Sequence, residues 1–567
     1  MKTRSALPHP ALLAPGSALL LTLTACTLNG GRSGSADGFL TSQSMTAGTT
    51  VLSSVKPTGR ATFGKDRSAG GAGLTVAGVA YPRGLGVSAP STLEYNLGAQ
   101  CRSFTAQVGI DDDSGASGAA TFKVFVDGRP MFDSGSLRAG ASKAVNVNVE
   151  GGETLQLVAE GAGGTHADWA DAKVDGCVVY QAPIEVMPYG SGTLTITGNY
   201  RSDALDVPAI KISTTQPVVI KNCVVAGRGH LISTRMNGEF TVGSNVTVQN
   251  CRGYGLNPDE RMGVPGRFLH IQAPASLTVQ NDFMKGTSGI YIQGGENGTL
   301  GRLSIVRNRA LNIDGRRSDG KGGWLIPGPS DTQDKFFRVQ FVQLNAVRST
   351  PDAEIAWNRV ENEPGYSRVE DNISIYESSG TPGHPIRIHH NLIRGAYAYP
   401  ADLEGYSGGG IITDGCVSRH VDIGNNTVLE TSNHGIAIAN GEAVAIHDNR
   451  VLGTGLLPDG RHAGGADNGI YVRWARNCSQ LGVNLNSNTV TGNTVGFGQP
   501  TPGRPDQRSD LYIATTSQGK PLAQQSGNTR IAPLDESITR SNPDIITQAV
   551  TDWEGLLGSN GVTVGPE

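Results

Sequence analysis

The stretch 434–451, HGIAIANGEAVAIHDNRV, contains both of the short phrases that decide the fold of most of this chain. In HGIAIANG, aliphatic residues alternate with small ones. In AIHDNRV, an aliphatic residue stands three positions before an Asn and five before another apolar residue. This second phrase recurs at Ile305/Asn308/Ala310, Ile355/Asn358/Val360, Ile388/Asn391/Ile393, Ile423/Asn426/Val428, Ile446/Asn449/Val451 and Leu485/Asn488/Val490, and around Asn222, Asn250 and Asn281.

The alternating phrase recurs between the Asn positions, as RFLHIQA (267–273), SGIYIQGG (288–295), NISIYESS (372–379), GGIITDG (409–415) and NGIYVRWA (468–475). Alternation with a period of two is typical of strands, and its irregular repetition without helical periodicity predicts a solenoid of parallel strands, two in each repeat. Aliphatic residues would fill its core, and the Asn column would form stacked amides at the turns. A structural role is therefore the favoured reading of these Asn residues.

The twin phrases resemble those of right-handed parallel β-helix proteins, the architecture of pectate lyases and other polysaccharide-active enzymes. The resemblance implies such a domain over residues 183–530. Within 531–567, Pro543 begins a predicted helix that carries its apolar side chains on one face and is followed by Gly558. Because a solenoid must cover its open ends, we expect this segment to be a C-terminal cap and tail. The expected fold class is therefore all-β with one capping helix.

Residues 50–180 form a second predicted unit, a β-sandwich. Alternating strands recur at 93–97, 104–110, 122–128 and 155–161, with Gly and Asp between them. Five motifs follow in order: GLGVS (84–88), Phe104 with VGIDD (108–112), Phe122 with VDG (126–128), DSG (133–135) and HADWA (166–170). Together they resemble the NPCBM carbohydrate-binding modules found beside bacterial glycoside hydrolases, which implies a jelly-roll-like sandwich that binds galactose-type or related sugars. The residue that follows GLGV, usually His in that family, is Ser88 here.

Candidate sugar contacts in this unit are His166, Asp168 and Trp169. An indole can stack on the apolar face of a sugar, and the polar side chains can bond its hydroxyls. The alternative is that Asp168 and Trp169 cap and pack the last strand. Asp111, Asp112 and Asp113 offer hard oxygen ligands that suit calcium, against the alternative of a simple turn. No other cofactor or metal is predicted.

The N-terminus carries an export signal, with Lys2 and Arg4 before an apolar segment at 11–25. The sequence Leu23-Thr24-Ala25-Cys26 resembles the lipobox of bacterial lipoproteins. That resemblance implies a signal peptide over 1–26 and a diacylated Cys26, which would anchor the protein to the cell envelope outside the cytoplasm. Residues 27–49 are rich in Gly, Ser and Thr and are expected to be a flexible tether.

Export also sets the redox environment, and an even number of further cysteines favours disulfides. Cys223 and Cys251 each follow a marked Asn in successive repeats and are expected to pair. Cys101 is expected to pair with Cys177 within the sandwich, and Cys416 with Cys478. The net charge of −4, with 17% charged residues, gives no argument for nucleic acid. The expected partner is a polysaccharide, and the expected state is a monomer.

The chemistry is expected on the alternating phrase. If Ile290, Ile373, Ile411, Ile436 and Ile470 point inward, the alternate residues face solvent. Aromatic, acidic and basic side chains along such a sheet are typical of a saccharide groove. The candidates on or beside the strands are Tyr291, Gln293, Tyr376, Glu377, Asp414, His434, Asp467, Tyr471, Arg473 and Trp474, with Asp371 just before its strand.

Two reactions fit these residues. Glu377 and Asp414 end successive phrases and, one coil apart, would approach the roughly 5–5.5 Å of retaining glycosidases. Alternatively, Tyr376 or His434 as base, with Arg473 neutralising a uronate, would permit β-elimination. The favoured function is a polysaccharide lyase or glycoside hydrolase. A non-catalytic glycan binder or envelope scaffold, in which the two carboxylates only close solvated turns, is the rival, and a uronate epimerase is a further alternative.

Overall fold

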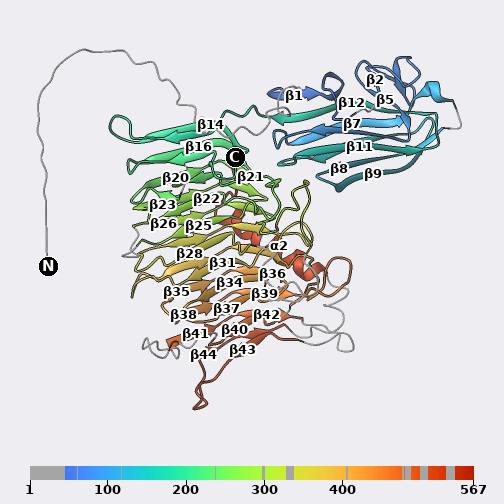
Figure 1. The fold of residues 1–567 in the computed structure, drawn as a ribbon. Coiled ribbons are helices and arrows are strands. Elements are labelled where there is room, and N and C mark those ends of the chain that lie inside the picture. The colour runs from blue at the N-terminus through green and yellow to red at the C-terminus, as the bar shows by residue number, and fades with distance from the viewer. Residues whose placement is uncertain are drawn as a thin grey trace, which may run out of the picture. The chain divides into compact units, whose positions relative to one another are not determined.

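The computed structural model describes residues 45–566 except 60–61, 116–117, 237, 296–300, 327–336, 404–406, 466, 475–477, 479–486, 499–507 and 532–542. Cys26, the signal peptide and most of the tether lie outside these residues. Within them the chain is all-β apart from short 3-10 turns and one α-helix, α2 (Pro543–Ser559) (Figure 1). None of the described helices has the length and apolar character that crossing a membrane requires.

The N-terminal unit is a sandwich of two antiparallel sheets with its own buried core. The hairpin of β3 (Leu74–Val76) and β4 (Val79–Tyr81) stands beside them. The larger sheet contains β1 (Gly48–Val51), β2 (Gly64–Lys65), β5 (Gly84–Ala89), β7 (Ser103–Ile110), β10 (Ser142–Asn148) and β12 (Thr165–Cys177), and the smaller one β6 (Ser91–Asn96), β8 (Ala119–Val126), β9 (Arg129–Arg138) and β11 (Thr154–Gly161). The sandwich predicted for 50–180 is confirmed, and its first strand begins slightly earlier.

The rest of the chain is a stack of coils whose strands form two long parallel sheets. One sheet, here the front sheet, takes one strand from each coil: β13 (Ile184–Val186), β15 (Ile210–Ile212), β17 (Ile232–Ser233), β22 (Leu269–Gln272), β25 (Ile290–Gln293), β28 (Val342–Asn345), β31 (Asp371–Tyr376), β34 (Gly409–Asp414), β37 (Ile436–Ile438), β40 (Ile470–Val472) and β43 (Leu511–Ile513). Six of these strands are the alternating phrases of the sequence, namely β22, β25, β31, β34, β37 and β40, whereas the other five were not predicted.

The other sheet, here the back sheet, takes two short strands from most coils, so that a coil contains three strands and not the predicted two. Its strands are β14 (Leu194–Ser202), β16 (Val218–Gly227), β20 (Asn245–Gln249), β21 (Arg252–Gly255), β23 (Ser276–Gln280), β24 (Phe283–Lys285), β26 (Leu303–Val306), β27 (Arg309–Leu311), β29 (Glu354–Ala356), β30 (Arg359–Glu361), β32 (Ile386–His389), β33 (Leu392–Ala396), β35 (Arg419–Gly424), β36 (Thr427–Thr431), β38 (Glu442–His447), β39 (Arg450–Gly453), β41 (Asn488–Thr491), β42 (Thr494–Phe497), β44 (Ala523–Ser526) and β45 (Thr529–Arg530). A small hairpin, β18 (Arg235–Met236) and β19 (Glu239–Phe240), leaves the stack.

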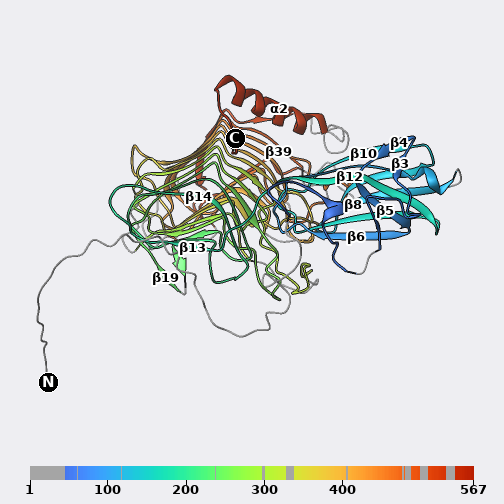
Figure 2. The same cartoon turned by 90° about the horizontal axis from the view of Figure 1, so that it is seen from above.

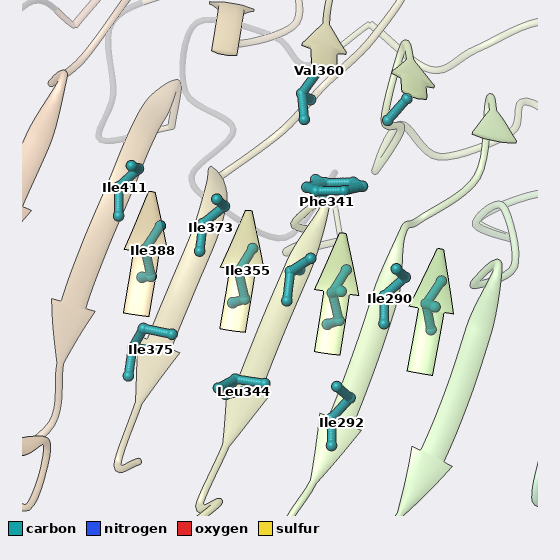
Figure 3. Packing of buried hydrophobic residues seen from close by; sticks show 14 of the residues in the cluster. Ile290, Ile292, Phe341, Leu344, Ile355, Val360, Ile373, Ile375, Ile388 and Ile411 are labelled. Carbon is teal, nitrogen blue, oxygen red and sulfur yellow. The ribbon is translucent and has the colours of Figure 1, made fainter. Parts of the chain in front are cut away.

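Aliphatic side chains from both sheets meet inside the coils and form one continuous core. Figure 3 shows Ile290, Ile373 and Ile411 of the front sheet facing Ile355 and Ile388 of the back sheet. Each of these side chains is fully buried. The predicted inward set of the alternating phrase is therefore confirmed.

A column of Asn side chains, buried in all but the last coil, marks the corner between the two back strands of successive coils. Each Nδ2 donates to Oδ1 of the Asn in the next coil, at 2.9–3.0 Å, along Asn308, Asn358, Asn391, Asn426, Asn449, Asn493 and Asn528. The structural role expected of this column is confirmed.

The column departs from the predicted positions at both ends. In the first coils, the left-handed corner conformation lies one residue before the column position. It is adopted there by Asn222, Asn250 and Asn281, with φ of 51–54°. At the third of these corners, the next residue, Asp282, occupies the column position. At the C-terminal end, Asn493 occupies the column position that was predicted for Asn488, and it accepts the backbone N–H of Asn449. Asn488 instead accepts a hydrogen bond from the backbone N–H of Val444.

Helix α2 was expected to cover the last coil, but it lies elsewhere. Ile546, Ala549, Val550 and Trp553 pack against Leu392, Leu429 and Leu452, which point outward from three successive back strands. Figure 2 shows the helix running alongside the coils. The expectation of an end cap is therefore wrong for α2, because the back sheet offers its apolar face a matching row of leucines.

Candidate functional site

The outward face of the front sheet carries two columns of aligned side chains. Tyr291, Gln343, Ser374, Ile412, Ala437 and Tyr471 form one column across neighbouring strands. Gln272, Gln293, Asn345, Tyr376 and Asp414 form the second, at the strand ends. Five of the predicted residues thus lie on one surface, although Ala437 and Tyr471 are almost fully buried there.

Three carboxyl groups lie along two paired front strands, Glu370 and Asp371 at the start of β31 and Asp414 at the end of β34. Burial raises the pKa of Asp371 well above its usual range, and the nearby charges of Glu370 and Asp414 raise it further. Burial and the charge of Asp414 likewise raise the pKa of Glu370, whose Oε2 accepts a hydrogen bond from Gln340 Nε2 at 3.1 Å. Asp371 therefore holds its proton at a pH where a solvated Asp has lost it.

His434 approaches Asp371 from two coils away. Its Nε2 lies 3.4 Å from Asp371 Oδ1, although β34 runs between the two residues. The approach passes over Gly409, where an added Cβ would stand 2.2 Å from Asp371 Oδ1 and 2.4 Å from His434 Cε1. A glycine in the middle coil thus lets the two side chains meet.

The surroundings of His434 keep its imidazole neutral. Burial lowers its pKa to about 4, against the opposing charge of Asp467. Its Nδ1 lies 2.8 Å from Asn433 Oδ1, and the Tyr471 ring packs edge-on at 5.2 Å. A neutral histidine bonded on Nδ1 leaves Nε2 to face the Asp371 carboxyl group.

Arg473 is held by an acidic partner. Its Nη1 and Nη2 donate to the two carboxylate oxygens of Asp467, both at 2.5 Å. The guanidinium also lies over the rings of Tyr471 and Tyr512, at 4.5 and 5.2 Å from their centroids. Trp474, the next residue, is 40% exposed and is thus available for stacking. Arg473 therefore organises an aromatic surface.

Glu377 and Asp414 leave the front sheet at the same edge, where Glu377 N–H donates to Asp414 O at 3.0 Å. In register, however, Asp414 is aligned with Tyr376. Glu377 comes one residue later, with φ of 52°, and its carboxylate accepts the backbone N–H of Cys416. Sequence reasoning passed over Glu370 and left Asp371 outside the catalytic set, although both stand directly before a recognised strand.

The predicted sugar contacts in the sandwich occupy different environments. Trp169 is fully buried between Phe104 and Phe122, so the stacking role predicted for it is wrong: packing of the last strand claims its ring. Asp168 is also buried, and burial together with Asp111 raises its pKa to about 10. His166 is partly exposed, with Nδ1 2.6 Å from Asp113 Oδ1.

The three-aspartate segment forms a turn. Asp111 caps the short 3-10 helix Asp112–Ser114 by accepting the N–H of Asp113, and its other oxygen accepts Thr75 N–H. In the described part of the chain no group of three or more His, Cys, Asp or Glu side chains is arranged to hold a metal ion. The turn alternative thus accounts for these residues.

All three expected disulfides are present, Cys101–Cys177, Cys223–Cys251 and Cys416–Cys478. The last pair joins coils on either side of the β37 coil. It holds the loop beside Glu377 and Asp414, and Asn440 Nδ2 donates to Cys478 Sγ at 3.1 Å. The disulfide therefore fixes one edge of the carboxylate site.

Comparison with known families identifies one part of the chain. Residues 46–175 match the family model of the NPCBM/NEW2 domain. A curated relative from Renibacterium salmoninarum, named as an endo-alpha-N-acetylgalactosaminidase, is 37% identical over 130 residues, which are 22% of this chain and 8% of the relative. The shared part is therefore a small fraction of that protein.

Solved structures add two likenesses. CBM51 from Clostridium perfringens GH95, in complex with methyl-galactose, is 30% identical and covers 22% of this chain and 99% of that chain, with a TM-score of 0.21. The catalytic domain of a GH87 alpha-1,3-glucanase is 12% identical and covers 86% of this chain and 99% of that chain, with a TM-score of 0.28. Scores this low carry no argument about activity. The family match identifies residues 46–175 as a carbohydrate-binding module of the NPCBM type.

Proposed function

We propose that the chain binds a glycan through the NPCBM-type module and hydrolyses it on the front sheet, around Asp371 and Asp414. The module supports the substrate class, since a carbohydrate-binding domain keeps an attached catalytic surface close to its polymer. The observation that carries the reaction is the buried Asp371 carboxyl group, which lies 3.4 Å from His434 Nε2, next in the chain to Glu370, and whose pKa is raised by burial.

Glycoside hydrolysis needs one carboxylic acid, which protonates the leaving oxygen, and one carboxylate, which acts as base or nucleophile. Asp371 is the acid and donates its proton to the departing glycosidic oxygen. Asp414, partly exposed at the end of β34, is the partner carboxylate: it takes a proton from the water whose oxygen bonds to the anomeric carbon as the glycosidic bond breaks. Neutral His434 faces the Asp371 carboxyl group across Gly409 and positions it. As the pH rises and Asp371 loses its proton, turnover falls, at a pH above the usual range for Asp.

The same surroundings favour hydrolysis over β-elimination. Elimination from a uronate needs a cation that neutralises the sugar carboxylate beside the base. Arg473, the predicted cation, has two hydrogen bonds to Asp467. Burial lowers the pKa of His434 to about 4, so its imidazole is uncharged at neutral pH. Neither side chain therefore offers free positive charge at the carboxylate centre.

The test is loss of turnover in Asp371→Asn and Asp414→Asn. Both should lower kcat by at least about a hundredfold while melting temperature and glycan affinity stay near wild type. Asp459→Asn, which changes an exposed loop carboxylate, is the matched control. Reducing-end release from a panel of polysaccharides provides the measurement. Full activity in both site variants would contradict the assignment, and a wild type that binds glycans without cleaving any would favour the binding scaffold.

We further propose that the coil stack is a right-handed parallel β-helix of the pectate-lyase-like type. Connections between parallel strands of one sheet are right-handed in nearly all proteins, which supports this hand. We also propose that a lipid on Cys26 anchors the protein to the cell envelope. Three disulfides fit an oxidising compartment outside the cytoplasm.

A further inference from the structure

A cavity of about 390 Å³ lies at the turns that follow three successive front strands, and its lining is basic. Arg348 follows β28, the segment from Ser379 to Pro382 follows β31, and Val417 follows β34. The back strand β35 supplies two more residues of the wall, Arg419 and His420. The full lining is Arg348, Ser349, Ser379, Gly380, Thr381, Pro382, Val417, Arg419 and His420.

The positive charge of this cavity is poorly compensated. Arg348 meets a carboxylate only at 3.9 Å, from its Nη2 to Glu377 Oε2, and that carboxylate also accepts Cys416 N–H. Among the described residues, no side chain bonds or pairs with the guanidinium of Arg419, although Glu442 is aligned with it on the next coil. The N–H donors of an arginine guanidinium normally bond to an anion or to carbonyl groups.

The remaining lining supplies hydroxyl donors. Ser379 Oγ accepts the backbone N–H of Ser349 at 2.9 Å, which leaves its proton for another acceptor. Thr381 sits on a short turn closed by two backbone bonds to His384. Guanidinium groups with hydroxyls around one cavity are the donor set that carboxylates and sulfates prefer.

We propose that this cavity binds the carboxylate or sulfate of an acidic sugar, so that the glycan cleaved beside it is anionic. The inference rests on the proposed function, because it names the class of its substrate. The cavity directly follows the aligned pair Tyr376 and Asp414 at the end of the front sheet. A sugar seated over Asp414 therefore places a charged substituent of itself or its neighbour within reach of Arg348 and Arg419.

The location also separates recognition from chemistry. Arg473 is occupied by Asp467, and Arg338, at the buried acids, lies 3.5 Å from Glu370. At the cavity, positive charge stands beyond the strand ends, whereas Asp371 lies at the start of β31. An anionic polymer is thus held at one edge of the site while the acid keeps its proton.

The test is equilibrium binding to the full chain by calorimetry. The probes are short oligomers of galacturonate, glucuronate and mannuronate, each paired with its uncharged methyl ester, and sodium sulfate alone. At least one free-acid oligomer should bind about tenfold tighter than its ester, and added salt should reduce the difference. Arg419→Gln and Arg348→Gln should each remove most of that preference. Arg394→Gln, on an exposed site of β33, should leave it intact.

Each result bears on the inference. Equal affinity for acid and ester, or an unchanged preference in both arginine variants at normal melting temperature, overturns it. Binding of sulfate without any oligomer reduces the cavity to a small-anion site and also overturns the glycan assignment. The Asp371→Asn chain keeps the charge preference if the inference holds. A wild type that binds acidic oligomers but hydrolyses nothing supports the cavity and removes the proposed reaction, and hydrolysis of neutral glycans alone does the reverse.

Discussion

Asp282 is a carboxylic acid in a column that later coils fill with Asn. Its backbone N–H donates to Asn308 Oδ1 at 3.0 Å, and its own Oδ1 accepts Cys251 N–H at 2.7 Å. Burial raises its pKa well above the usual range. The folded protein therefore keeps a proton here that the unfolded chain releases above a pH of about 4.

Asp282→Asn should stabilise the protein at neutral pH. The folded state binds the extra proton, so the wild type loses stability as pH rises from about 4 towards the raised pKa, whereas the variant does not. The gain in unfolding free energy should therefore be present at neutral pH and vanish below a pH of about 4. Urea denaturation of both proteins at several pH values measures it. Identical midpoints throughout would show that Asp282 is ionised in the fold.

The same residues show what sequence patterns resolve. The Asn column was predictable from spacing, because each buried amide bonds the amide of the next coil and an Asn must therefore recur once per coil. Asn281 was misplaced by one position, since the left-handed corner also favours Asn and spacing does not distinguish the two places. The role of Gly409 was not predictable, because only the meeting of Asp371 and His434 from different coils reveals why a side chain is absent there.

At the scale of elements, α2 shows how an apolar face can be predicted without its partner. Trp553 is buried against the back sheet, and its Nε1–H donates to His390 O at 2.9 Å. Arg359 and Arg450 form ion pairs with Glu554 and Asp552 at the sides of the helix. The sequence identified the helix and its buried face. It did not identify the leucine row, which arises only when three coils are stacked.

Trp553→Ala should lower the unfolding free energy by about 3 kcal/mol, because it removes a buried indole and a hydrogen bond. Leu556→Ala on the same helix, where the side chain is 39% exposed, should cost less than about 1 kcal/mol. Chemical denaturation followed by circular dichroism compares the two variants. Equal losses would mean that the helix packs differently from the arrangement described.

The back strands illustrate a second limit of prediction. Strands such as β27 and β30 have three residues each, too few to show a period of two. Front strands such as β25 and β31 alternate clearly over four to six residues and were therefore recognised. The third strand of each coil becomes evident only from its pairing with the coils above and below.

At the scale of the whole molecule, the carboxylate site is assembled from coils of unequal length. Asp371, Asp414 and His434 lie on three successive coils, while Arg473 comes from a fourth. The sequence placed most of these residues on one sheet face, because the alternating phrases could be aligned. Which carboxyl groups are buried together could not be predicted, since that depends on the loops that cover them.

The proposed anchor concerns the molecule as a whole and has a simple test. Cys26→Ser should move the exported protein from the membrane fraction to the soluble fraction, because membrane attachment would depend on the acyl chains alone. Fractionation of cells that express each form, with glycan binding as a check of folding, measures the shift. Retention of the variant in the membrane fraction would count against lipid attachment at Cys26.

The Asn column gives the stack an electrical polarity. Backbone N–H groups at the corners donate to Oδ1 of the next Asn, so these side-chain amides all point the same way along the axis. Their dipoles add as the peptide dipoles of a helix do, with the amide hydrogens towards the C-terminal coils. Aligned bonds also polarise one another. Replacing one Asn in a middle coil by an apolar residue would thus weaken its neighbours in both directions.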